Sequence, residues 1–310
     1  MHEPWWKKSV VYQIYPKSFL DTTGKGTGDL QGIRKKLDYL QELGVDVLWL
    51  TPVYKSPQND NGYDISDYYA IDPLYGTMKD FEELLEDTHA RGMRLIMDLV
   101  VNHTSTEHEW FKQSRSSKDN PFRDFYIWKD PVDGREPNRW ESKFGGSAWE
   151  FDEATGQYYL HLFDKTQADL NWENPKMREK IFEMMRYWAE KGIDGFRLDV
   201  INLISKKQDF PDDPDPTKDG RSQYTDGPRI HEFLHMMNQE VFSKCNMLTV
   251  GEMSSTSLEN CVLYTKPERE ELSMTFSFHH MKVDYPNGEK WTAAPFDFLE
   301  LKQLLSDWQI

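Results

Sequence analysis

The sequence has few cysteines, a shortage of positive charge and no long apolar run. Cys245 and Cys261 are the 2 cysteines among 310 residues. Two cysteines are too few for a disulfide framework, so we expect free thiols in a reducing compartment. The formal net charge of −16 argues against nucleic acid or an anionic membrane as the main partner. It leaves the charge of any single pocket open.

Signals for export and for membrane insertion are also missing. Residues 1–8 (MHEPWWKK) are not followed by the apolar stretch of about 7–15 residues that a secretory signal contains. No segment approaches the roughly 18 apolar residues of a membrane-spanning helix. These features predict a cytoplasmic protein.

Aromatic residues, by contrast, are abundant. The chain has 11 Trp, 15 Tyr and 17 Phe. Packing in a core accounts for most such residues. The alternative is a set of stacking platforms for sugar rings, since an aromatic face suits an apolar sugar face.

Apolar strand-like segments alternate with amphipathic helix-like segments along most of the chain. Six strands are predicted, at residues 10–15, 45–50, 93–101, 195–200, 248–253 and 272–278. Asp29, Thr77 and Asn174 have the type and position of N-caps for intervening helices. Strands that are apolar on both faces belong to parallel sheets covered by helices. A doubly wound sheet is one such fold, but acids at several strand ends favour a barrel, where catalytic residues gather at C-terminal ends of strands.

The alternation stops between residues 103 and 173, which are rich in Trp, Asp, Lys, Gly and Pro. We therefore predict a subdomain at 103–173, inserted into a barrel formed by 1–102 and 174–310. A second irregular segment, residues 206–227, is predicted to be a polar loop rich in Pro and Asp.

Two predicted strands each end in one carboxylate. Asp199 is the last residue but one of the segment 195–200 (GFRLDV), and Glu252 is the last residue but one of the segment 248–253 (LTVGEM). Each acid alone is also consistent with a helix N-cap or a loop residue. Arg197 shares a strand face with Asp199, because residues two apart point the same way. A buried arginine there would keep the carboxylate ionised and oriented, as a nucleophile requires, whereas Glu252 would need surroundings that raise its pKa to act as a general acid.

Three segments, 98–103 (DLVVNH), 195–200 and 250–252 (VGE), resemble conserved regions of the α-amylase family, glycoside hydrolase family thirteen. Residues 59–64 (NDNGYD) resemble the substrate loop that follows the second strand in that family. The resemblance covers essentially the whole chain. It implies a (β/α)8 barrel with subdomain B inserted after the third strand, and a retaining mechanism without a cofactor.

The resemblance also implies roles for single residues. Asp199 would be the nucleophile and Glu252 the acid/base, with carboxyl groups ~5–5.5 Å apart across the scissile bond. Asp60 and Tyr63 would hold and stack on the terminal glucose. His103 and Arg197 would bind its hydroxyls and the nucleophile. Phe163 and Gln167 would lie at the pocket mouth. His103 is also consistent with a core histidine, and Phe163 with the core of the subdomain.

Two features depart from the family pattern. The third catalytic acid of the family lies in an Asn-His-Asp motif, and the only Asn-His pair in this chain is 102–103. We count six βα units, the N-terminal six of the barrel, and expect an incomplete, nearly inactive fragment with open sheet edges. A non-catalytic binding domain is the alternative. In the loop 21–29, Lys25 stands where relatives have a carboxylate ligand for a cation, so no metal is expected there.

The expected substrate is a phosphorylated disaccharide. Residues 200–202 (VIN) resemble the oligo-1,6-glucosidase branch. Residues 15–19 (YPKSF), 224–229 (YTDGPR) and 278–285 (FHHMKVDY) resemble members of that branch that hydrolyse α,α-trehalose 6-phosphate to glucose and glucose 6-phosphate. Short isomalto-oligosaccharides are the alternative substrate, and the oligomeric state stays open.

Binding a phosphate group requires a cation beyond the glucose pocket, because the net charge would otherwise repel it. Lys282 is the first candidate and Lys290 the second. Each is also consistent with a solvated surface lysine. His280, in the same motif as Lys282, is a further candidate for substrate binding.

Overall fold

A six-stranded parallel sheet forms the centre of the protein. The computed structural model describes residues 4–215, 218–285 and 294–309. The strands follow one another across the sheet in chain order: β1 (Val11–Ile14), β2 (Val47–Leu50), β5 (Arg94–Leu99), β11 (Gly195–Leu198), β12 (Leu248–Met253) and β13 (Met274–Ser277). Every neighbouring pair is parallel. These are the six predicted strands. A doubly wound sheet would reverse its strand order at a switch point, and this sheet does not.

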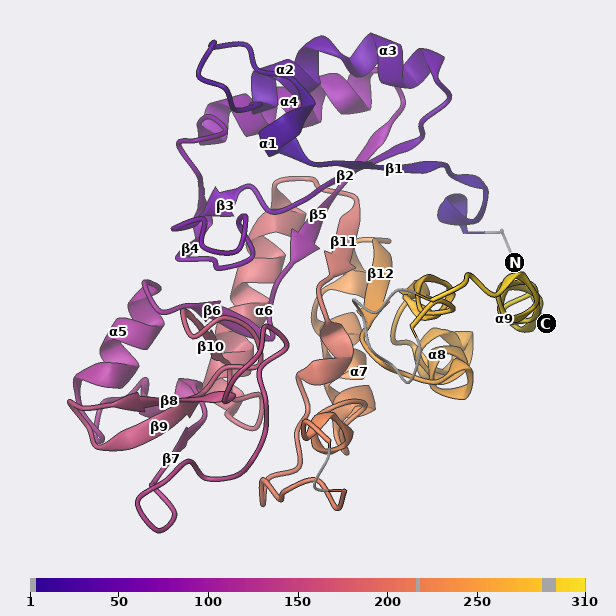
Figure 1. Ribbon diagram of the computed structural model, residues 1–310. Coiled ribbons are helices and arrows are strands. Elements are labelled where there is room, and N and C mark those ends of the chain that lie inside the picture. Colours follow the sequence, from indigo (N-terminus) through magenta and orange to yellow (C-terminus); the bar gives the residue numbers. More distant parts are fainter. Residues whose placement is uncertain (1–3, 216–217, 286–293, 310) are drawn as a thin grey trace.

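Helices connect the strands and cover one face of the curled sheet (Figure 1). They are α2 (Leu30–Lys35), α3 (Leu37–Glu42), α4 (Met78–Ala90), α6 (Pro175–Glu190), α7 (Ile230–Glu240) and α8 (Leu258–Thr265), with a short α1 (Pro16–Phe19) after β1. The last helix, α9 (Phe298–Asp307), follows β13 and has no buried residue. None of the helices in the described ranges is long and apolar enough to cross a membrane.

The predicted helix starts are confirmed. Asp29 accepts a hydrogen bond from the Gly32 amide, and Asn174 accepts from two amides of α6. Thr77 and Asp80 form a reciprocal capping box. One predicted helix is instead two, α2 and α3, because the Lys36 amide bonds to the carbonyl of Ile33, three residues back, at 2.9 Å and tightens the turn.

The insertion predicted after the third strand of the sheet consists of short antiparallel strands and one helix. They are β6 (His103–Ser105), α5 (Glu109–Ser116), β7 (Trp128–Lys129), β8 (Trp149–Asp152), β9 (Gln157–Leu160) and β10 (Gln167–Asp169). Strands β7, β9 and β8 form one sheet, and β10 pairs with β6. In Figure 1 they gather at the lower left, away from α2, α3 and α4. The boundaries at 103 and 173 stay a prediction.

The remaining elements are short. A hairpin of β3 (Tyr54–Lys55) and β4 (Asp67–Ile71) follows β2. The 3-10 turns are η1 (Trp5–Lys8), η2 (Arg123–Phe125), η3 (Ile201–Leu203), η4 (Arg221–Gln223), η5 (Phe242–Lys244), η6 (Pro267–Arg269) and η7 (His279–Met281).

The two faces of the sheet bury different residues. Leu48, Leu95 and Phe196 pack against the helices in the main apolar core. Val47 and Ile96 belong to a small cluster on the other, concave face, where partly buried Trp49 joins them. Since side chains alternate along a strand, the residues two positions further towards the C-terminal end of each strand lie on this same concave face. That continuation carries the polar site.

Strands β11 and β12 approach so closely that Gly195 has no room for a side chain. A Cβ at Gly195 would lie 2.0 Å from the Leu248 carbonyl oxygen. The contact is with backbone on a paired strand, which cannot turn aside as a side chain could. The glycine is therefore required for the pairing that brings the two strands together.

We predict that Gly195→Ala lowers the free energy of unfolding by at least about 3 kcal/mol, the upper part of the usual range for overpacking, because the obstacle is backbone. Gly24→Ala is the control, since Gly24 has φ +73° but no atom within 4 Å of an added Cβ. It should cost about 1–2 kcal/mol from backbone conformation alone. Urea unfolding followed by circular dichroism measures both. Equal losses for the two variants would contradict the packing argument.

Candidate active site

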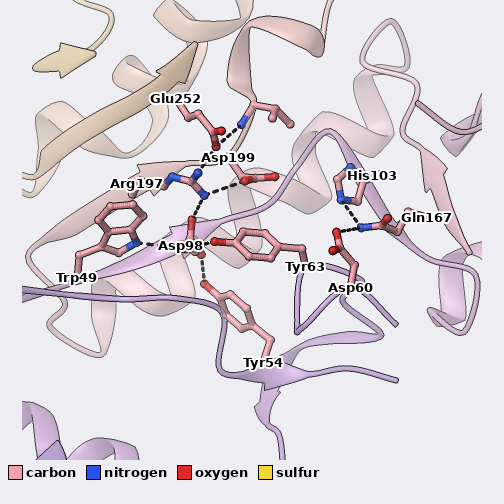
Figure 2. A network of polar contacts seen from close by, with 11 residues as sticks. Trp49, Tyr54, Asp60, Tyr63, Asp98, His103, Gln167, Arg197, Asp199 and Glu252 are labelled. Atoms are coloured by element: carbon pink, nitrogen blue, oxygen red, sulfur yellow. Dashed lines mark hydrogen bonds and ion pairs between the residues drawn. The ribbon is translucent and has the colours of Figure 1, made fainter. Parts of the chain in front are cut away.

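A buried guanidinium lies at the centre of the site (Figure 2). Nη1 of Arg197 donates to Asp199 Oδ1 at 2.7 Å and also to Asp98, and Nη2 donates to Glu252. All four side chains are buried; Asp98 is fully enclosed, and Arg197 is 5% exposed. Arg197 therefore connects carboxylates from three neighbouring strands.

The sheet register explains why these side chains meet. Arg197 on β11 is opposite Asp98 on β5 and opposite Val250 on β12. Glu252 is two residues beyond Val250 and so points to the same face. Because parallel strands present their carboxyl ends at one edge, the acids gather above the apolar cluster of the concave face.

Burial dominates the titration of the carboxyl groups. It raises the pKa of Asp199 to about 7 and that of Asp98 to about 6, and in both cases Arg197 opposes the rise. Burial alone would lower the pKa of Arg197, but the three carboxylates raise it above its ordinary value. The contact expected between Arg197 and Asp199 is present, but burial outweighs its effect on the pKa.

Glu252 shares the guanidinium with Asp199. Its carboxylate accepts hydrogen bonds from the Arg197 guanidinium and, at 3.4 Å, from the Val200 amide. Arg197 thus contacts both acids, where the sequence assigned it to the glucose hydroxyls and the nucleophile.

The amide of Val200 reaches Glu252 through an unusual backbone turn. Val200 has φ +37° and ψ +40°, the left-handed region, which β-branched residues rarely adopt. Strain of this kind persists only where the surroundings enforce it, and it is common at functional sites. Here the turn ends β11 directly after Asp199.

Aromatic side chains surround the carboxylate of Asp98. Trp49 Nε1 and the Tyr63 hydroxyl donate to Asp98 Oδ2 at 3.1 and 3.2 Å, and the Tyr54 hydroxyl donates to its carbonyl at 2.8 Å. Sequence reasoning noted Asp98 only as a strand acid and missed Trp49. An acid within the mostly apolar segment 93–101 was the signal for Asp98, whereas nothing marked Trp49.

A second polar group, visible in Figure 2, joins the loop after β2 to the insertion. Gln167 Nε2 lies 2.9 Å from Asp60 Oδ2 and 3.2 Å from His103 Nε2. Burial raises the pKa of Asp60 and lowers that of His103, so the neutral imidazole is favoured. The Phe163 ring is 5.1 Å from the His103 ring. The structure thus brings together four of the predicted pocket residues, although they come from separate segments.

Behind His103 is a buried support that sequence reasoning missed. Asn102 Nδ2 lies 3.2 Å from His103 Nδ1 and donates to Asp169 at 3.1 Å. Lys206 Nζ pairs with Asp169 at 2.9 Å and donates to Asn102 Oδ1 at 3.2 Å. Lys206 was placed at the start of a polar loop rich in Pro and Asp, and it is 1% exposed. Its burial is stabilised by the ion pair, which no local sequence pattern reveals.

Two of the residues predicted to bind the outer part of the substrate, His280 and Lys282, belong to or follow η7. Lys282 directly follows η7, and Arg221 is its charged neighbour. Partial burial and this like charge lower the pKa of Lys282. His280 is exposed on η7. Lys290 lies outside the described residues.

The loop in which no metal was expected is ordered by its own backbone. The Asp21 carboxylate accepts hydrogen bonds from the amides of Thr23, Gly24 and Gly26, and these bonds lower its pKa to about 2. Lys25 is exposed. Throughout the described ranges, no group of three or more His, Cys, Asp or Glu side chains could hold a metal ion.

A curled parallel half-barrel with acids at the ends of its strands defines a class of barrel enzyme, and comparison with known proteins identifies the family. The protein-family model described as the alpha amylase catalytic domain matches residues 13–310 of this sequence. The chain therefore belongs to the α-amylase family of glycoside hydrolases, as its motifs predicted.

Similar proteins include trehalose-6-phosphate hydrolases and oligo-1,6-glucosidases. A trehalose-6-phosphate hydrolase of Bacillus subtilis (strain 168) is 69% identical over 99% of this chain and 54% of its own length. An oligo-1,6-glucosidase of Parageobacillus thermoglucosidasius is 57% identical over 100% of this chain and 56% of its own length. The crystal structure of the Bacillus licheniformis trehalose-6-phosphate hydrolase matches at a TM-score of 0.96, with 68% identity over 99% of this chain and 55% of that one. The chain thus spans about half the length of these relatives.

We predict that Arg197→Met lowers the free energy of unfolding by about 3–5 kcal/mol at pH 7, because it leaves buried carboxylates without a cation. The loss should shrink as the pH falls, since protonation of Asp98 and Asp199 removes the unpaired charges. Arg34→Met is the control. Arg34 pairs with Glu83 and Asp87 on a surface where its side chain is 34% exposed, and exposed pairs contribute about 0–1 kcal/mol. Chemical unfolding between pH 5 and 8 measures both variants, and a pH-independent loss for Arg197→Met would be inconsistent with this account.

Proposed function

We propose that this site belongs to a retaining glycoside hydrolase that cleaves α,α-trehalose 6-phosphate to glucose and glucose 6-phosphate. The observation that carries the proposal is the meeting of Asp199 and Glu252 on one guanidinium, at the ends of adjacent strands. The 69% identical relative that is named a trehalose-6-phosphate hydrolase supports the substrate.

In the first proposed step, Asp199 attacks the anomeric carbon of the terminal glucose. A bond forms between its carboxylate oxygen and C1, the bond from C1 to the bridging oxygen breaks, and Glu252 gives that oxygen a proton. In the second step Glu252 takes a proton from water, which attacks C1 and releases glucose and the Asp199 carboxylate.

In the proposed complex the sugar lies between Asp199 and Glu252, as in a retaining pair whose carboxyl groups are ~5–5.5 Å apart. The same guanidinium binds both carboxylates, Asp199 through Nη1 and Glu252 through Nη2. Arg197 therefore orients both the proposed nucleophile and the proposed acid/base.

The second polar group suits the terminal glucose. Asp60, His103 and Gln167 are already held by one another, so the hydroxyls of a sugar would find donors and acceptors in fixed positions. Preorganised groups of this kind lower the cost of ordering side chains on binding.

We predict that an activated, fluorinated α-glucosyl donor adds one glycosyl unit to this chain, on Asp199, as seen by intact-mass and peptide-mass spectrometry. This experiment requires only the first step. Because the nucleophile must be ionised and burial raises the pKa of Asp199 to about 7, labelling should slow as the pH falls below 7. Asp199→Asn should abolish the label. Asp194→Asn is the control, since Asp194 precedes the same strand but pairs with exposed His89 and Arg94. Labelling of any residue other than Asp199 would exclude it as the nucleophile.

We also predict that any hydrolysis by this chain, which is expected to be nearly inactive, favours α,α-trehalose 6-phosphate over unphosphorylated trehalose and isomaltose. The preference should be at least about tenfold in kcat/KM, the effect of one charge-assisted hydrogen bond. Release of glucose measured for the three substrates tests this. Preference for isomaltose would instead favour the function named for the 57% identical oligo-1,6-glucosidase. Equal or faster cleavage of unphosphorylated trehalose would overturn the proposed substrate.

A further inference from the structure

Three cationic side chains come from different loops and lie within electrostatic reach of one another. Lys143 lies in the insertion between β7 and β8, Arg221 begins η4 in the loop after β11, and Lys282 follows η7 after β13. All three loops extend from the C-terminal ends of sheet strands, the edge that carries the carboxylates. The gathering is unexpected from composition, because the whole chain has a net charge of −16.

Lys143 is anchored to the segment that carries Phe163. Its amide donates to the Leu162 carbonyl at 2.8 Å, and the Ser142 hydroxyl donates to the Phe163 carbonyl at 2.7 Å. The Phe163 ring in turn contacts His103. These bonds hold the backbone of Lys143 beside the predicted pocket mouth.

Tyr224 connects Lys143 to the nucleophile strand. Lys143 Nζ lies 5.2 Å from the centre of the Tyr224 ring, a cation–π contact. Tyr224 is fully buried and belongs to the same apolar cluster as Val200, the residue after Asp199. Its hydroxyl is buried without a hydrogen-bond partner in the described part of the chain.

The three cations are not neutralised by nearby acids. Asp219 binds Nε and Nη2 of Arg221, and no hydrogen bond to a described residue uses Nη1. The charges that act most strongly on the Lys143 ammonium are those of Arg221, Asp219 and Lys282, and the carboxylate among them, Asp219, pairs with Arg221.

The electrostatic cost of this arrangement is visible at Lys143. Burial lowers the pKa of Lys143 to about 8, the charges of Arg221 and Lys282 lower it further, and Asp219 opposes them. A bound anion would relieve both the repulsion and the cost of burial. A phosphate monoester carries −1.5 to −2 charge at pH 7 and would supply such an anion.

We propose that Lys143, Arg221 and Lys282 together bind the phosphate group of a phosphorylated sugar. This inference rests on the proposed function and deepens it, since it assigns Lys143 and Arg221 to a subsite for which the sequence offered only Lys282 and Lys290. The free Nη1 edge of Arg221 and the two ammonium groups supply charge-assisted donors from three sides.

The test compares binding of glucose 6-phosphate and glucose to this chain by calorimetry, so that it does not depend on turnover. The parent chain should bind glucose 6-phosphate more tightly. Lys143→Gln and Arg221→Gln should each reduce the ratio of the two affinities by about tenfold, the effect of one charge-assisted hydrogen bond. Lys218→Gln is the matched control, because it removes the same charge from an exposed lysine in the loop of Arg221. Circular dichroism checks that each variant is folded.

The possible outcomes separate the two proposals. If the parent chain prefers glucose 6-phosphate and both variants keep that preference, the assignment of Lys143 and Arg221 is wrong and the proposed function stands. If Lys218→Gln reduces the ratio as much as the others, the effect is general charge and the subsite is again wrong. If the parent chain shows no preference, the phosphorylated substrate itself is excluded.

The pH dependence gives a second, independent readout. Lys143 is faced by Arg221, Lys282, Asp219 and the ring of Tyr224, and it loses its charge as the pH rises through about 8. The preference of the parent chain for glucose 6-phosphate should therefore fall between pH 7 and 9. Lys143→Arg keeps the charge in this range and should flatten the profile. Identical profiles for parent and variant would show that Lys143 does not contact the phosphate.

Discussion

The buried guanidinium of Arg197 is the interaction on which the rest of the site depends. Asp98, Asp199 and Glu252 come from three consecutive strands of the sheet. Without a cation between them, three carboxylates could not be enclosed together in their ionised forms, because each would lose its hydration and repel the others. The network requires strands β5, β11 and β12 to be adjacent, parallel and in one register. Gly195 permits the approach of β11 to β12, and the alternation of side chains delivers the charges to one face.

The same constraint shapes the chemistry. Enclosure pushes Asp98 and Asp199 towards protonation while Arg197 resists it, so the acids titrate near neutral pH instead of near pH 4. A group poised in this range changes its charge when a substrate adds or removes one neighbour. In the proposed phosphate subsite, by contrast, Asp219 pairs with Arg221 while Lys143 and Lys282 add positive charge beside it.

Particular residues show how far sequence reasoning extends. The six strands, the caps at Asp29, Thr77 and Asn174, and the contact between Arg197 and Asp199 followed from patterns of local range, and the structure confirms them. Asp98 was seen as a charge in an apolar strand, but its partners Trp49 and Tyr54 are on β2 and β3, too far along the chain for any spacing rule. Lys206 was read as part of a polar loop because its neighbours are polar, although its own partner, Asp169, comes from the insertion.

By itself, the sequence determined the order of strands and helices, the family and the acids at the strand ends, because hydrophobic alternation, capping and motif spacing act over a few neighbouring residues. The tertiary structure alone decided which charges share a site: that Arg197 binds Glu252 as well as Asp199, that Lys206 is buried behind His103, and that Lys143 meets Arg221 and Lys282. These are encounters between segments separated by tens of residues. Their pairing depends on the curl of the sheet and on the low polarity of its interior, which strengthens each charge interaction and makes every unpaired charge costly.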